Sequence, residues 1–235
     1  MTRADTRTVI APLLNTTPAD ALAAYFALEH DPRRTRLVVR ADSAGRVAAF
    51  VAVCQTGMDL FRPLIVARGD DSAALRDALR EALAPGRQYL FSIPPLIRPD
   101  LEAVAHLHGE IMVATFALQR ADFKPVVNIL VQTSRTPDGQ LRASIPARGE
   151  GLAAEAGTSW ISSRYAELFV SVVESLRNRG LGRSVVSAVS AQVLDMGRVP
   201  LYMTGEDNAP SRRLALALGY HDTDARDLTG ACARR

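Results

Sequence analysis

Two glycines and three arginines meet in the segment Arg177-Asn178-Arg179-Gly180-Leu181-Gly182-Arg183. Residues 166–173 before it are rich in β-branched and aromatic side chains, a composition typical of a strand. Residues 184–196 after it carry valines at helical spacing. We therefore predict a strand-to-helix turn whose backbone amides and helix dipole favour an anion such as a pyrophosphate.

Two common phosphate-binding motifs do not fit this turn. A Walker loop needs Gly-Lys-Ser/Thr, and the chain's only lysine is Lys124. A dinucleotide-binding fingerprint needs a third glycine, and Ser184-Val185 stands there instead. A plain connection between a strand and a helix remains an alternative, as does an ordinary nucleotide-binding α/β protein.

Three further signals follow the turn in a fixed order. Residues 200–203 predict the next strand, Asn208-Ala209-Pro210-Ser211 the start of a helix, and Gly219-Tyr220 its end. Together with Arg177-x-x-Gly180-x-Gly182, they resemble the acyl-CoA-binding region of the GNAT acetyltransferase superfamily. The resemblance covers about residues 140–225. It implies the GNAT fold, an α/β architecture with a mixed central sheet flanked by helices.

The resemblance also implies which residues hold acetyl-CoA. Loop amides and guanidinium groups would bind the pyrophosphate, while backbone groups of the preceding strand would hold pantetheine and polarise the thioester carbonyl. The expected cofactor-binding residues are Val172, Val173, Arg177, Asn178, Arg179, Gly180, Leu181, Gly182, Arg183, Asn208 and Ser211. Asn208 would contact pantetheine and is also expected to cap a helix.

Glu167 is the candidate catalytic base. Ala166-Glu167-Leu168 resembles the opening of the strand before the loop in many GNAT members. Strand alternation puts Glu167 on one face with Phe169, Ser171 and Val173. If that face lines the acceptor cleft, the carboxylate can take the amine proton directly or through water. The structural alternative is a solvent-facing strand residue.

The usual general acid of the superfamily is missing from this chain. Members that use a catalytic tyrosine carry it where this sequence has Ala215. Tyr202, Tyr220 and Ser211 are the candidate substitutes, and protonation of the thiolate by solvent is the alternative.

The N-terminal half repeats the order of elements expected in the C-terminal half. Residues 61–108 are predicted to run strand, helix, strand, helix, with the last helix over 99–106. Arg68-Gly69-Asp70-Asp71 stands where the phosphate loop would be, and its carboxylates would repel phosphate. The alternative is that strands and helices simply alternate, as in any α/β chain.

We therefore expect two domains and one competent acyl-CoA site. Residues 1–124 form a degenerate GNAT-like half, and residues 125–235 form the acyl-CoA-binding domain. The second domain is predicted to open with two strands, over residues 126–133 and 140–145, joined by the turn Thr136-Pro137-Asp138-Gly139.

Composition excludes several other classes. The 235 residues carry a formal net charge of +3 without a long Lys/Arg run, so nucleic acid is not expected, and CoA phosphates suffice as the anionic partner. Cys54 and Cys232 are far apart, and His106-x-His108 has no third ligand nearby, so neither a disulfide framework nor a metal site is expected. No apolar run is long enough for a membrane span, and the expected compartment is the cytoplasm.

The expected function is transfer of an acetyl group from acetyl-CoA to a primary amine of a small molecule. A non-catalytic, CoA-binding regulatory module with the same fold is the alternative, favoured by Ala215 and the degenerate first half. The acceptor itself stays open, because specificity would come from N-terminal elements and loops that resemble the family least. A homodimer formed by strand pairing is compatible with the sequence.

Overall fold

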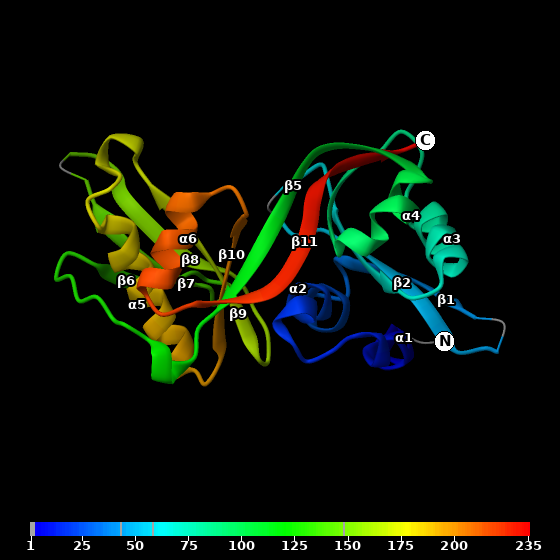
Figure 1. Ribbon diagram of the computed structural model, residues 1–235, viewed down its shortest axis with the longest axis horizontal. Coiled ribbons are helices and arrows are strands. Elements are labelled where there is room, and N and C mark those ends of the chain that lie inside the picture. Colours follow the sequence, from blue (N-terminus) through cyan, green and yellow to red (C-terminus); the bar gives the residue numbers. More distant parts are fainter. Residues whose placement is uncertain (1–2, 43, 58, 148) are drawn as a thin grey trace. The chain divides into compact units, whose positions relative to one another are not determined.

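The computed structural model describes residues 3–42, 44–57, 59–147 and 149–235, which form two compact units (Figure 1). Unit 1 comprises Met1–Val113 and Ala225–Arg235, and unit 2 comprises Ala114–Asp224. Strands β5 (Ala105–Ala117) and β11 (His221–Arg234) contribute residues to both units.

This division differs from the expected domains 1–124 and 125–235. The C-terminal strand β11 pairs antiparallel with β4 (Gln88–Ile93), with Leu228 opposite Ile93. The end of the chain therefore completes the sheet of unit 1, and a single cut in the sequence cannot describe the two units.

Unit 1 is a mixed sheet with helices packed on it. Its strands follow the order β1-β2-β3-β4-β11-β5, with β1, β2 and β3 antiparallel and β3 parallel to β4. Leu75 and Leu79 of α3 are buried in its core with Phe91 of β4. Its other elements are α1 (Arg3–Ile10), η1 (Ala11–Leu13), η2 (Pro18–Asp20), α2 (Ala21–Ala24), η3 (Tyr25–Glu29), β1 (Thr35–Ala41), β2 (Val47–Cys54), β3 (Leu64–Gly69), α3 (Ser72–Ala82), η4 (Pro95–Ile97) and α4 (Arg98–Glu102).

Unit 2 has the same kind of architecture. Its strands follow the order β5-β10-β9-β8-β7-β6, in which β9 is parallel to β10 and antiparallel to β8. Val185, Val189 and Val193 form the buried stripe of α5. Its other elements are η5 (Arg120–Asp122), β6 (Gln132–Arg135), β7 (Leu141–Pro146), β8 (Leu152–Ile161), β9 (Tyr165–Val172), η6 (Glu174–Leu176), α5 (Leu181–Asp195), β10 (Val199–Gly205) and α6 (Ala209–Ala217).

The predicted mixed sheet flanked by helices is confirmed, and so is the repeated order of elements. The series β3-α3-β4-α4 of unit 1 corresponds to β9-α5-β10-α6 of unit 2. In both, two antiparallel strands precede the series, and its own two strands are parallel. The first half thus repeats this order of strands and helices from the second half.

Three local predictions were wrong or missing. The helix predicted over 99–106 ends at Glu102, because a short turn leads directly into β5 at Ala105. The strand predicted over 126–133 begins only at Gln132, because Val126 donates its backbone N–H to Ser187 Oγ on α5 at 2.8 Å instead of joining the sheet. Strand β11 was not predicted at all.

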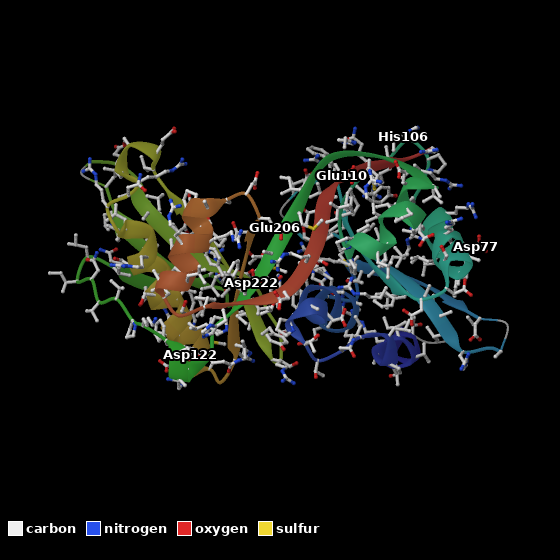
Figure 2. All side chains as sticks on the ribbon, in the orientation of Figure 1. Asp77, His106, Glu110, Asp122, Glu206 and Asp222 are labelled. Carbon is white, nitrogen blue, oxygen red and sulfur yellow. The ribbon has the colours of Figure 1, made fainter. Side chains whose placement is uncertain are left out.

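The acidic side chains labelled in Figure 2 include several that form surface ion pairs. Asp77 pairs with Arg80, and Glu110 pairs with Arg98 at 2.8 Å. Exposed pairs of this kind contribute little to stability, since water and salt screen them. A buried ion pair in unit 1, described below, is more sensitive to mutation, because the loss of one partner leaves a buried charge uncompensated.

Candidate functional site

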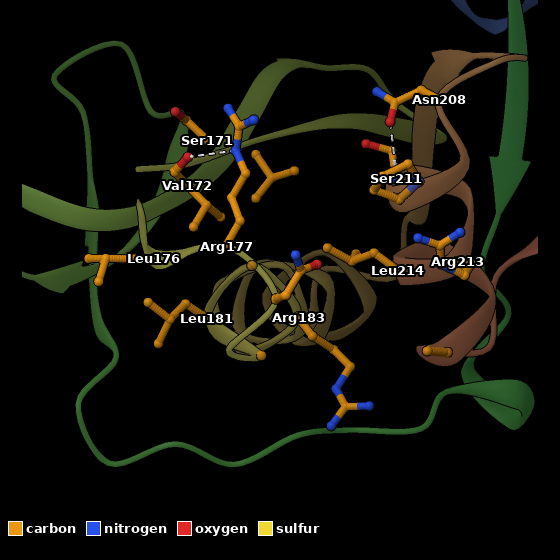
Figure 3. A pocket seen from close by; sticks show the side chains of 16 residues that line it. Ser171, Val172, Leu176, Arg177, Leu181, Arg183, Asn208, Ser211, Arg213 and Leu214 are labelled. Carbon is orange, nitrogen blue, oxygen red and sulfur yellow. Dashed lines mark hydrogen bonds between the residues drawn. The ribbon is translucent and has the colours of Figure 1, made fainter. Parts of the chain in front are cut away.

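A cleft of about 900 Å³ opens in unit 2 where the end of β9, the start of α5 and one face of α6 meet (Figure 3). Its walls combine short apolar side chains with arginine, asparagine and serine. The residues that line it are Val170, Ser171, Val172, Leu176, Arg177, Asn178, Gly180, Leu181, Gly182, Arg183, Asn208, Pro210, Ser211, Arg213, Leu214 and Ala217.

The loop between β9 and α5 presents free backbone amides to this cleft. Asn178 and Gly180 have positive φ angles of 62° and 78°, and Gly180 is the N-cap of α5. The first intrahelical bond runs from Ser184 N to Gly180 O at 3.1 Å. The amides of residues 181–183 precede that bond, and a glycine cap offers them no side-chain acceptor. Such a helix start binds anions through its amides and its dipole.

Gly182 allows three elements to meet at the floor of the cleft. A Cβ atom on Gly182 would lie 3.1 Å from Val172 Cγ2 and 3.2 Å from Leu214 Cδ1. The missing side chain thus brings the first turn of α5 close to both β9 and α6. The two glycines of the motif are needed for different reasons: Gly180 adopts a positive φ angle, and Gly182 allows neighbouring elements to approach closely.

The strands beside the cleft part from each other. The parallel ladder between β9 and β10 runs as far as Leu168 opposite Tyr202. Both strands continue further, to Val172 and Gly205. Beyond Leu168 and Tyr202 the described residues of the two strands do not pair, and Val170, Ser171 and Val172 of β9 line the cleft.

The charge of the cleft is positive. Arg177, Arg183 and Arg213 line it, and none of the described lining residues is a carboxylate. Arg177 Nε donates to Val172 O at 3.4 Å, the bond drawn in Figure 3. An anionic ligand therefore meets guanidinium groups as well as the free amides of the helix start.

Nine of the eleven residues expected to bind the cofactor line this cleft. Val173 and Arg179 do not. The backbone N–H of Val173 is donated to Ala153 O at 3.1 Å, and the Arg179 side chain is exposed. Asn208 accepts a hydrogen bond from Ser211 N at 3.2 Å, so the predicted helix cap is confirmed (Figure 3).

Sequence reasoning missed one wall of the cleft, formed by α6. Pro210, Arg213, Leu214 and Ala217 recur at helical spacing and share one face of that helix. Helical periodicity starting at Asn208 could have indicated these residues. The missed lining residues are Pro210, Arg213, Leu214 and Ala217 of α6, together with Val170 and Ser171 of β9 and Leu176 of η6.

Glu167 lies on β9 and does not line the cleft. It stands opposite Trp160 of β8 and Leu201 of β10. Burial raises the pKa of Glu167 to about 7. A side-chain hydrogen bond from Trp160 opposes this shift, because it lowers the pKa. A carboxyl group with this pKa exchanges its proton near neutral pH, which is the property that a general base needs.

Residues 148–228 match the family model of FR47-like proteins. A GCN5-related N-acetyltransferase-like protein from Streptococcus suis 89/1591 covers all of both chains, with 16% identity and a TM-score of 0.64. The chain has the GNAT fold. A GCN5-related N-acetyltransferase from Kribbella flavida is similar over 92% of this chain and 93% of its own, with 18% identity and a TM-score of 0.63.

A tandem GNAT protein from the clavulanic acid biosynthesis pathway is also similar, over 98% of this chain and 93% of its own, with 14% identity and a TM-score of 0.58. A comparison with curated protein sequences found no match. The GNAT resemblance of the sequence is therefore confirmed at the level of the fold.

In this GNAT fold the three candidate proton donors have different surroundings. Tyr202 is buried, and its hydroxyl hydrogen-bonds to Ser211, which lines the cleft. Tyr220 lies 2.7 Å from Ser190 Oγ inside the core, away from the cleft. Ala215, at the usual tyrosine position, is fully buried. The pair of Tyr202 and Ser211 is therefore the remaining protein-based donor.

In the corresponding loop of unit 1, a side chain of the protein already occupies the helix start. Asp71 Oδ1 accepts from Ala74 N at 2.9 Å and so caps α3 with a carboxylate. Arg68 turns inward, with its Nε 2.6 Å from Asp20 Oδ1, and both side chains are buried. A phosphate would meet a carboxylate at this helix start, so the loop of unit 1 disfavours anions.

Within the described ranges, no group of three or more His, Cys, Asp or Glu side chains is arranged to hold a metal ion. No helix in those ranges is long and apolar enough to cross a membrane.

Proposed function

We propose that the protein transfers an acetyl group from acetyl-CoA to a primary amine of a small molecule. The observation that carries the proposal is the uncapped start of α5, which opens into a carboxylate-free cleft beside two parting strands. This cleft offers amides and a guanidinium for a pyrophosphate, and a gap between strands for a narrow chain.

The residues of the cleft suit each part of acetyl-CoA. The amides of residues 181–183 and the guanidinium of Arg177 bind the pyrophosphate. Backbone groups of residues 170–172 hold the pantetheine arm in the gap beside β10. When bound, acetyl-CoA supplies an activated thioester carbonyl. Backbone amides that face the carbonyl oxygen stabilise the negative charge that develops on it.

Proton transfer is assigned to two groups. The acceptor reacts as the neutral amine, and Glu167 accepts, directly or through water, the proton that its nitrogen loses as the C–N bond forms and the C–S bond breaks. Tyr202, hydrogen-bonded to Ser211, donates a proton to the departing thiolate and is re-protonated from solvent. The pKa of Glu167, about 7, supports the base, because a carboxylate of ordinary pKa is a much weaker acceptor.

A CoA-binding module without catalytic activity is the second candidate. Its support is Ala215, a buried methyl group where the superfamily's tyrosine usually stands. Both candidates bind acetyl-CoA, but only the first transfers its acetyl group to an amine. They also share the expectation that only the unit 2 cleft is competent, since Asp71 caps the matching helix in unit 1.

Calorimetric titration and a thiol-release assay test the proposal together. The protein is titrated with acetyl-CoA, ATP and NAD, and then incubated with acetyl-CoA and a panel of small amines. Binding of acetyl-CoA alone, with amine-dependent thiol release, supports the enzyme. Binding without release on any amine supports the second candidate. Preference for ATP or NAD, or no binding, contradicts both.

A further inference from the structure

Arg213 lines the cleft without a partner of its own. It has no hydrogen bond and no ion pair within the part of the chain that the structure describes. Its neighbour Arg212 is held in place, with NH1 donating to Glu206 O at 3.0 Å and NH2 3.9 Å from Asp222 Oδ2. Two adjacent arginines of α6 thus differ: one serves the fold, and the other is free in a positive cleft.

Arg213 lies on the α6 wall of the same cleft into which the start of α5 opens. Leu214, the next residue, packs against the first turn of α5, since a Cβ atom added to Gly182 would lie 3.2 Å from Leu214 Cδ1. Figure 3 shows Arg177 and Arg213 on different elements, with Arg183 pointing to the side of α5 opposite Arg177. Arg213 is therefore a separate cation, supplied by α6 rather than by the phosphate loop.

A pyrophosphate does not use all of this positive charge. The free amides of α5 and Arg177 already supply donors for its oxygens. A guanidinium without a counter-ion, in a cleft wall that contains no carboxylate, favours a second anionic group on the same ligand. CoA carries such a group, the 3′-phosphate of its ribose, which is close to a dianion at neutral pH.

We infer that Arg213 binds the 3′-phosphate of CoA, so that the protein distinguishes CoA thioesters from their 3′-dephospho forms. This inference rests on the proposed function, because it takes acyl-CoA as the ligand. A charge-assisted contact from an exposed arginine is worth about tenfold in affinity. It also weakens as salt is added.

The test compares CoA with 3′-dephospho-CoA by calorimetric titration of the full chain. Wild type is measured beside Arg213→Gln and the control Arg135→Gln, which removes the same charge from exposed strand β6, outside the cleft. We expect wild type and the control to bind CoA about tenfold more tightly than 3′-dephospho-CoA. Arg213→Gln should bind both ligands with the affinity that wild type has for 3′-dephospho-CoA.

Three results would overturn the inference, and they can be told apart. Equal affinity of wild type for the two ligands means that the 3′-phosphate is not recognised. An equal loss for both ligands in Arg213→Gln means that Arg213 contacts the pyrophosphate instead. If wild type binds neither ligand, the proposed function fails and the inference fails with it. Arg213 is exposed, so the substitution should leave folding intact, and thermal unfolding of each variant checks this.

Discussion

Replacing Glu167 by glutamine separates the two consequences of its burial. Burial raises the pKa of Glu167 from 4.5 to about 7, so above pH 7 the folded protein must hold a charged carboxylate in a poorly solvated position. Each pKa unit corresponds to about 1.4 kcal/mol, so the ionised side chain costs up to about 3 kcal/mol of stability. Glutamine removes the charge and keeps an oxygen that can accept from Trp160.

The sign of the pH dependence follows from the two pKa values. Below pH 4.5, Glu167 is protonated in both the folded and the unfolded chain, and its burial costs nothing. Between pH 4.5 and about 7 the folded state binds more protons, so this group's contribution falls as pH rises. At pH 8, Glu167→Gln should therefore unfold roughly 6–12 °C above wild type, and near pH 4.5 at the same temperature.

Glu167→Gln should raise the stability at pH 8 but lower the catalytic activity. A lost general base lowers kcat/KM by roughly 10²-fold or more. The rise of the wild-type rate with an apparent pKa near 7 should disappear in the variant. Glu150→Gln is the control, because Glu150 is exposed, and it should change neither the melting temperature nor the rate. The reasoning is refuted if Glu167→Gln is no more stable than wild type at pH 8, or if it keeps the pH-dependent rise in rate.

Three further predictions concern other parts of the chain. Arg68→Met should cost about 3–5 kcal/mol in urea unfolding because it leaves Asp20 buried without its cation; an unchanged midpoint would contradict this. Tyr202→Phe should lower kcat with little change in KM, because it removes the proposed proton donor. Tyr220→Phe should affect stability alone, because its hydroxyl bonds to Ser190 in the core. Equal rates in wild type and Tyr202→Phe would mean that solvent protonates the thiolate. Gly182→Val should cost about 1–3 kcal/mol by crowding the cleft floor and should weaken acetyl-CoA binding; unchanged affinity in titration would separate Gly182 from the ligand site.

The sequence predicted the parts of the site that are local in the chain. The loop, its strand and its helix are continuous, so residues such as Gly180 and Gly182 could be assigned from one motif. Arg213 lies on a second helix, and its approach to the cleft depends on the packing of Leu214 against α5. That packing is tertiary and has no signature in the motif itself.

Strand β11 shows why the domain division could not be predicted. Its sequence from His221 to Arg234 is rich in charged and small residues, which have low strand propensity. It becomes a strand because it fits beside β4, far away in the sequence, where Leu228 and Cys232 are buried. The raised pKa of Glu167 has the same origin, since it reflects burial that alternation along a single strand does not reveal.

The most direct test of the account is a calorimetric titration of the full chain with acetyl-CoA. The account predicts one binding site per chain, in unit 2, because the matching helix start in unit 1 is capped by Asp71. Gly180→Asp, which puts a carboxylate at the start of α5 where φ is 78°, should abolish that binding. No binding to wild type, two sites per chain, or full affinity in Gly180→Asp would contradict the account.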